Sequence, residues 1–125
     1  MNVVDSSGWL EYFGKGTNAG FFAPVIKKTD ALYVPTVCIY EVFRRLLSQR
    51  GEEAALQAIG VMSLGTIVDL TREIAVNAAA ISTRYKIAMA DSIILATARS
   101  HGARLWTQDI DFAGMDGVAY VEKGG

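Results

Sequence analysis

Short apolar strands alternate with helical patterns along the chain, and this alternation constrains the fold more than any other feature. Strands are expected at residues 2–4, 32–34, 66–70, 105–106 and 118–121. Helices are expected at residues 7–13, 21–28, 37–50, 52–62, 71–85 and 89–101. Such alternation is typical of a parallel sheet with helices on both faces. We therefore expect an α/β domain with three layers, α/β/α, and a central, mostly parallel sheet of four or five strands.

Small and hydroxyl residues mark the expected ends of the helices. After the first helix, Gly14, Gly16 and Gly20 are expected to interrupt the chain, because glycine weakens a helix. Thr36 is placed to cap the helix at residues 37–50. Gly102 suits the left-handed position that follows the helix at residues 89–101.

Apolar residues that repeat at helical spacing predict which helix faces are buried. In the helix at residues 37–50 they are Ile39, Val42, Phe43, Leu46 and Leu47. In the next two helices they are Ala55, Leu56, Ile59, Met62, Ile74, Ala75, Ala78 and Ile81. The single cysteine, Cys38, is expected to be a small buried hydrophobe.

Length and composition favour one domain. The 125 residues are enough for one core and are interpreted as a single domain, residues 1–125, in which only Gly124 and Gly125 look loose. A hydrophobic share of 51% predicts an apolar face for self-association. No apolar run reaches the roughly 20 residues that span a bilayer, and no secretory signal is evident. We expect a cytoplasmic protein without a membrane partner.

Acidic residues recur where the expected strands end. Asp5 follows the first strand, Glu41 lies in the helix after the second, and Asp109 follows the fourth, with Asp111 just beyond. Because the carboxyl ends of parallel strands share one edge of the sheet, these side chains are expected to converge there. Asp91 opens the helix at residues 89–101 and joins them only if that helix starts at the same edge.

Two of these acids also have simpler interpretations. Asp5 could merely cap the helix that starts near Gly8. Glu41 lies three and four residues before Arg44 and Arg45, a spacing that is also typical of surface ion pairs on a helix.

Converging carboxylates repel one another unless a cation neutralises them. Oxygen ligands without cysteine or histidine favour Mg²⁺ or Mn²⁺ over zinc. The single histidine, His101, is expected in the last turn of a helix, with no nucleophile for it to activate. Such an ion could orient water for attack on a phosphodiester.

Four stretches carry a resemblance to a known family over nearly the whole chain. They are VVDSS at residues 3–7, YEV with two arginines at residues 40–45, ADSIILATA at residues 90–98 and WTQDIDF at residues 106–112. The last two are the most specific, because flanking residues match as well as the acids. The chain resembles PIN-domain ribonucleases, and among them the short toxins of VapBC toxin–antitoxin pairs. Ser92 is a mild departure, since a small apolar residue is commoner at that position.

The resemblance implies a metal-dependent endoribonuclease with Mg²⁺ or Mn²⁺, a homodimer and a cognate VapB-like antitoxin. The implied metal-site residues are Asp5, Glu41, Asp91 and Asp109, with Asp111 as a less certain member. Ser6 or Thr107 would supply an auxiliary hydroxyl. Since the net charge is −1, RNA must be bound by a local patch. The candidates are Arg44, Arg45, Arg50, Arg84 and Lys86.

Three other interpretations stay open from the sequence. One is a PIN nuclease of RNA processing or DNA repair that has no antitoxin. Another is a receiver-type signalling module, although the residues after Trp106 are Thr107, Gln108 and Asp109 where such a module needs a lysine. The last is a binding protein without catalysis, which the full set of acids disfavours.

Overall fold

A parallel sheet forms the centre of the computed structural model, which describes residues 1–124. Within these residues its five strands lie in the order β3-β2-β1-β4-β5, and every neighbouring pair is parallel. The strands are β1 (Asn2–Val4), β2 (Leu32–Pro35), β3 (Thr66–Val68), β4 (Arg104–Thr107) and β5 (Val118–Tyr120). The predicted α/β class and parallel sheet are confirmed, while the looseness expected of Gly125 lies outside the described residues.

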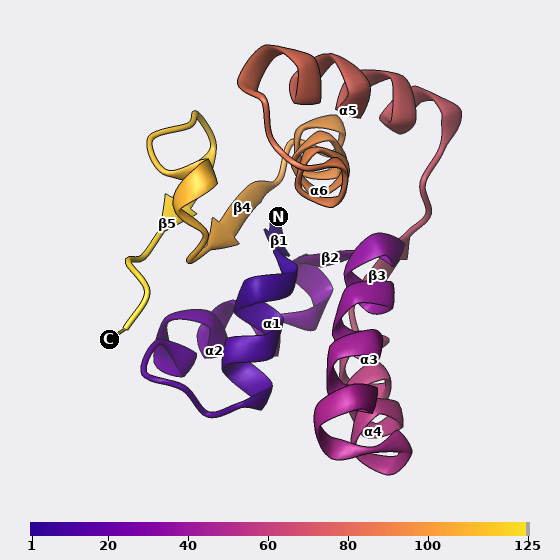
Figure 1. Cartoon of the computed structure of the whole chain (residues 1–125), viewed down its shortest axis with the longest axis vertical. Helices are drawn as coiled ribbons and strands as arrows, with labels where there is room; N and C mark the ends of the chain where they lie inside the picture. Colours follow the sequence, from indigo (N-terminus) through magenta and orange to yellow (C-terminus); the bar gives the residue numbers. More distant parts are fainter. Residues whose placement is uncertain (125) are drawn as a thin grey trace.

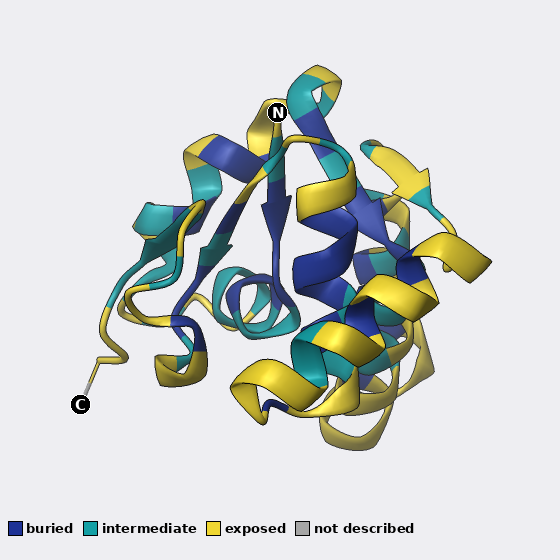
Figure 2. Cartoon of the chain, turned by 90° about the horizontal axis from the view of Figure 1, so that it is seen from above, coloured by how far each residue is buried: buried dark blue, intermediate teal, exposed yellow. Residues whose placement is uncertain are grey.

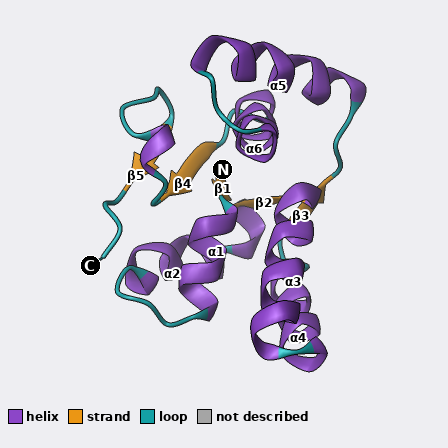
Figure 3. Cartoon of the chain, viewed as in Figure 1, coloured by secondary structure: helices purple, strands orange, loops and turns teal. Residues whose placement is uncertain are grey.

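Helices cover both faces of this sheet. They are α1 (Ser6–Phe13), α2 (Ala19–Lys27), α3 (Thr36–Arg50), α4 (Glu52–Met62), α5 (Arg72–Tyr85) and α6 (Met89–Ser100), with short 3₁₀ turns η1 (Thr29–Ala31) and η2 (Ile110–Phe112). Figure 1 shows α1 to α4 on one side of the strands and α5 with α6 on the other. The same layers are seen by element type in Figure 3. Right-handed crossovers explain this division, because the chain moves outward from β1 to β3 and then returns past β1 to β4.

The central strand β1 lies where the strand order reverses. Asn2 pairs with Leu32 of β2 on one side and with Arg104 of β4 on the other. Ligands bind at such a reversal point in open parallel sheets, outside the carboxyl ends of the strands. The residues that follow β1 and β4 therefore occupy the edge where a site is expected.

The core lies between the two helical layers and rigidly supports β1. Val3 and Val4 are fully buried, and Trp9, Phe22 and Leu105 pack into the same cluster. Figure 2 shows the central strands buried among helices whose outer faces are exposed. Each Å² of apolar surface removed from water stabilises the fold by about 25 cal/mol. Strand β1 is therefore a firm base for the residue that follows it.

The cysteine prediction is confirmed. Cys38 on α3 has no exposed surface, and its Sγ donates to the carbonyl O of Val4 over 3.8 Å. Burial raises the pKa of the Cys38 thiol far above its usual range. The thiol is therefore part of the packing between α3 and β1.

Two predicted helix ends were wrong. Gly20 lies inside α2, which begins at Ala19. Thr36 is the first residue of α3 and makes no capping hydrogen bond, and Pro35 occupies the cap position. Both helices begin one or two residues before the predicted start, a small shift at a helix end.

The predicted buried faces were too broad. Leu47 and Leu56 are 44% and 54% exposed, and Ala75 is also exposed. The buried residues of α3 are Cys38, Val42 and Leu46, four residues apart in turn. Beside this buried strip Ile39 and Phe43 are half-buried against the core, whereas Leu47 is exposed. Within residues 1–124, no helix is long and apolar enough to cross a bilayer.

Candidate active site

A cavity of about 500 Å³ opens at the carboxyl edge of the sheet. It is lined by Asp5, Ser6, Ser7, Leu10, Glu11, Tyr40, Glu41, Arg44, Arg45, Asp91, Gln108, Asp109 and Lys123. These residues come from α1, α3, α6 and the segments that follow β1, β4 and β5. Acidic side chains thus meet at one place although they are up to about a hundred residues apart in the chain.

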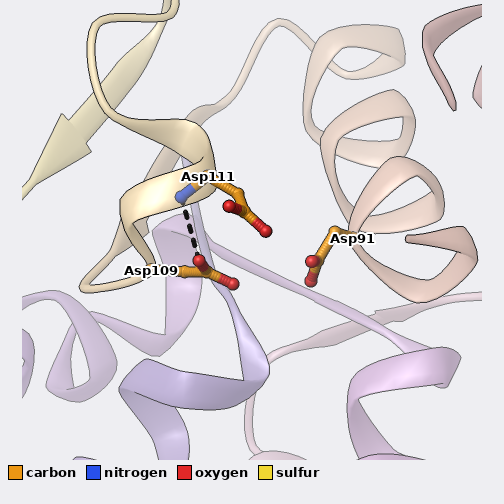
Figure 4. Close-up of side chains that lie close together, drawn as sticks. All are labelled: Asp91, Asp109 and Asp111. Atoms are coloured by element: carbon orange, nitrogen blue, oxygen red, sulfur yellow. Dashed lines mark hydrogen bonds between the residues drawn. The ribbon is translucent and has the colours of Figure 1, made fainter. Parts of the chain in front are cut away.

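Asp91, Asp109 and Asp111 form an open acidic trio. One carboxylate oxygen from each lies within 4.8 Å of the others, and Figure 4 shows Asp91 facing the other two across the gap. Asp109 is the cap of η2, where its Oδ1 accepts a hydrogen bond from the Asp111 backbone N–H at 3.0 Å. Asp91 lies in the first turn of α6. Helix α6 therefore starts at the carboxyl edge, which was the condition for Asp91 to join the cluster.

Asp5 belongs to a buried part of the same site. Its side chain is 2% exposed, and its Oδ1 accepts hydrogen bonds from Ser7 Oγ at 2.7 Å and the Gly8 N–H at 2.9 Å. The bond from Gly8 makes Asp5 the cap of α1. Asp5 therefore caps α1 and lines the cavity at the same time.

Thr107 links the buried and open parts. Its Oγ1 donates to Asp5 Oδ2 at 2.5 Å and accepts from the Asp109 backbone N–H at 2.9 Å. The residue has no exposed surface. The hydroxyl at the end of β4 thereby fixes the carboxylate after β1 and the backbone at Asp109 together.

Glu41 and Ser6 form the α3 side of the acidic region. Ser6 Oγ donates to Glu41 Oε1 at 2.6 Å. Both residues line the cavity and are partly buried. The hydroxyls of Ser6 and Thr107 therefore each support a carboxylate, Ser6 that of Glu41 and Thr107 that of Asp5.

The acids alter one another's protonation. Burial raises the pKa of Asp5 from 3.8 to about 6, against the opposing effect of its hydrogen bonds, and the charge of Asp109 raises it further. Burial also raises the pKa of Asp91 from 3.8 to about 7, with added repulsion from Asp109, Asp5, Glu41 and Asp111. Burial and the crowding of like charges thus raise the pKa values of both carboxyl groups towards neutral pH.

The predicted basic residues are not equivalent. Arg44 and Arg45 line the cavity. Lys86 occupies the left-handed position that ends α5, and the described lining residues do not include it. Arg50 donates to the carbonyl O of Phe13, and Arg84 lies over the ring of Tyr85. The structure thus brings only the first two next to the acids.

Four cavity or wall residues were missed in the sequence. Gln108 is 5% exposed, its Oε1 accepts from Asn18 Nδ2 at 3.0 Å, and its Nε2 lies 3.4 Å from Glu11 Oε1. Lys123 lines the cavity as well. Gln108 sits inside the WTQDIDF stretch, so its place in that motif could have drawn attention to it. Asn18, Glu11 and Lys123 have no comparable local signal.

The residues present fit a hard divalent cation. The trio offers carboxylate oxygens only, and the described lining residues contain no histidine or cysteine. His101 instead places its Nδ1 2.9 Å from the carbonyl O of Thr97. Mg²⁺ and Mn²⁺ prefer such oxygen ligands. Asp91, Asp109 and Asp111 could hold one ion, with Asp5 and Glu41 beside them.

Known proteins with the same fold were found by comparison of sequence and structure. Residues 3–118 match the family described as PIN domain. A toxin–antitoxin complex from Klebsiella pneumoniae contains a similar chain, with a TM-score of 0.81, 24% identity and coverage of 95% of this chain and 96% of that chain. VapC20 of Mycobacterium tuberculosis, described as a Sarcin-Ricin loop cleaving toxin, gives a TM-score of 0.79 and 17% identity, covering 94% and 97%.

A DNA-bound VapBC2 structure from Rickettsia felis is also similar, with a TM-score of 0.74, 13% identity and 97% of both chains covered. Comparison with curated proteins gave no match. At such identities the similarity to these three structures establishes the fold. The chemistry must be argued from the cavity itself.

Proposed function

This chain belongs to the PIN-domain family, and from that premise we propose that it is a Mg²⁺- or Mn²⁺-dependent endoribonuclease. The observation that carries the proposal is the convergence of acids: Asp91 and Asp109 line the cavity together with Asp5 and Glu41, and the Asp111 carboxylate lies next to those of Asp91 and Asp109. A family match supports nuclease chemistry in general, and the oxygen-only ligand set supports dependence on a hard cation.

The residues of the chain divide the work of the site. Asp91, Asp109 and Asp111 would hold the ion, which when bound supplies a nucleophilic water and stabilises the leaving oxygen. Thr107 and Ser7 keep the Asp5 carboxylate turned towards the cavity. Ser6 keeps Glu41 in place from the α3 side. Arg44 and Arg45 are suited to contact phosphate groups of the RNA.

We further propose that the protein acts in the cytoplasm as the toxin of a toxin–antitoxin pair. The similar chains from Klebsiella pneumoniae and Rickettsia felis belong to toxin–antitoxin assemblies, and the present chain spans nearly their whole length. Its partner would be a VapB-like antitoxin. Self-association is supported by Met89, which is 74% exposed although it is large and apolar.

Cleavage of RNA by the purified chain tests the activity. With Mg²⁺ or Mn²⁺ we expect cleavage that stops on addition of EDTA, and the Asp91→Asn variant should be inactive under all conditions. Full cleavage in EDTA with trace metals excluded would contradict the metal mechanism. Inhibition by the product of a neighbouring reading frame separates a toxin from a PIN nuclease of RNA processing, which would have no such inhibitor.

Sedimentation tests the homodimer. At tens of micromolar, an order of magnitude at which even modest interfaces are populated, the protein alone should sediment as a dimer. A monomer at that concentration would contradict the proposed self-association.

A further inference from the structure

The segment that follows β5 runs to the cavity and is held there by hydrogen bonds. The Val121 N–H donates to the carbonyl O of Thr107 at 3.0 Å, which extends the pairing of β5 with β4. Asn18 Nδ2 then donates to the carbonyl O of Glu122 at 2.9 Å. Figure 1 shows this segment, in yellow, descending towards α2. Lys123, the next residue, lines the cavity.

Asn18 also holds two residues that line the cavity, Glu11 and Gln108. Asn18 donates from its backbone N–H to Glu11 Oε2 at 2.8 Å and from Nδ2 to Gln108 Oε1 at 3.0 Å. Gln108 is nearly buried and directly precedes Asp109. Gly124 passes so close to Thr17 that a Cβ at Gly124 would lie 2.7 Å from the Thr17 Cβ. Lys123 is therefore held between two anchored residues.

The strand order places Lys123 and the arginines on opposite sides of the acids. Along the carboxyl edge the strands follow the order β2, β1, β4, β5. Arg44 and Arg45 lie on α3, which follows β2, whereas Lys123 follows β5. Asp5 and Asp109 follow the two strands between them. The cavity thus has an acidic floor with a cationic group at each end.

We propose that Lys123 is a second phosphate-binding residue, positioned by Asn18, and that an RNA strand crosses the acids between Lys123 and the arginines. This inference rests on the proposed ribonuclease function. Cations on both sides would neutralise the phosphates that flank the scissile bond, while the acids remain free for the metal ion. Arg44 and Arg45 alone would hold the strand on one side only. Lys123 is thus a substrate-binding residue, and Asn18 is a positioning residue.

The main test measures cleavage of a short single-stranded RNA at several salt concentrations. For Lys123→Gln we expect KM to rise about three- to fivefold, with kcat nearly unchanged, because one exposed ionic contact contributes modestly. The slope of log KM against log salt should fall by about 0.7, the value for one phosphate contact on a single strand. Lys123→Arg keeps the charge and should stay close to the parent.

Lys28 provides a matched control, because it is exposed and lies just before η1 and β2, at the opposite edge of the sheet. Lys28→Gln removes the same charge and should leave KM and the salt slope unchanged. Asn18→Ala should raise KM, and combining it with Lys123→Gln should add little further, since a released lysine no longer makes its contact.

Several outcomes would overturn the proposal for Lys123. If Lys123→Gln behaves like Lys28→Gln, Lys123 does not contact the phosphates of the RNA. If Lys123→Gln lowers kcat and leaves the salt slope unchanged, Lys123 has another role. If the effects of Asn18→Ala and Lys123→Gln on KM are fully additive, Asn18 does not position Lys123. Binding of the same RNA to the Asp91→Asn variant, measured by fluorescence anisotropy, tests the Lys123 contact separately from the proposed ribonuclease activity. RNA that binds through Lys123 without being cleaved by the parent contradicts the proposed function alone, and absence of RNA binding contradicts both.

Discussion

The acids of the cavity fall into two regions that are held in different ways. Asp5 is buried and accepts three hydrogen bonds, from Ser7, Gly8 and Thr107. Asp91 and Asp111 reach the trio from separate elements, and the hydrogen bond within the trio joins Asp111 to Asp109. The fold itself therefore fixes one carboxylate, whereas the trio is a set of like charges that a cation would stabilise.

The largest expected effect comes from Asp91→Asn, which breaks the open region. Removing one ligand and one charge should reduce RNA cleavage by at least about 100-fold. In thermal melts the variant should gain much less stability from Mg²⁺ than the parent, because binding to the native state stabilises in proportion to affinity. Asp30→Asn, an exposed acid on η1, is the control and should behave like the parent. A strong Mg²⁺ response in Asp91→Asn would exclude Asp91 from the ion site.

Asp5→Asn tests the buried region. Asparagine retains a side-chain oxygen for the Gly8 N–H, so the metal-free variant should be at least as stable as the parent, with less like charge crowded together. Cleavage should still collapse, and the stabilisation by Mg²⁺ should shrink less than in Asp91→Asn. Asp5→Ala, by contrast, should lose about 1 kcal/mol or more of folding free energy, because the cap is absent. An active Asp5→Asn variant would make Asp5 a cap and nothing more.

Thr107→Val uncouples the two regions with almost no change of shape. The valine cannot donate to Asp5 or accept from the Asp109 N–H, so we expect cleavage to fall roughly tenfold, the lower end of the range for a residue that supports a ligand. The free energy of unfolding should drop by about 1–3 kcal/mol, since buried polar groups lose their partner. Urea unfolding and cleavage rates measure both effects. Unchanged cleavage would mean that the two regions act independently.

The smallest expected effect is on the pH dependence of stability. The pKa of Asp91 is raised from 3.8 to about 7, so the folded state binds its proton more tightly than the unfolded state. Without divalent ions, stability should therefore fall as pH rises from about 4 to about 7. Mg²⁺ should stabilise the parent more at pH 8 than at pH 5, because ligands must be deprotonated. Melts of Asp91→Asn should show a weaker fall, and an identical fall would assign the effect to other groups.

The sequence was most informative where a pattern is local. Strand β1 and helix α4 have the predicted bounds, because an apolar run or a glycine boundary marks each of them. The convergence of acids followed from the rule for parallel strands, although Asp91 depended on where α6 begins. Leu47 and Leu56 were misplaced because the spacing of apolar residues does not say how wide a buried face is.

The missed residues share a different cause. Gln108 is held by Asn18, ninety positions away in the chain, and Lys123 reaches the cavity only because β5 pairs with β4. Neither contact leaves a periodic signal near the residue itself. The family resemblance makes Asp111 a less certain member of the metal site than Asp5 or Glu41. Its carboxylate nevertheless lies with those of Asp91 and Asp109, because the η2 turn brings it back beside Asp109.

The pairing of β1 with β4 also bears on how the chain folds. Val4 is made about a hundred residues before its partner Trp106. Contacts between residues so distant in sequence form late, because the closure of long loops must come first. Asp5 and Asp109 flank this pairing, so they cannot come together while β4 is still missing. A growing chain therefore lacks the assembled acidic cavity until β4 and the segment that carries Asp109 have been added.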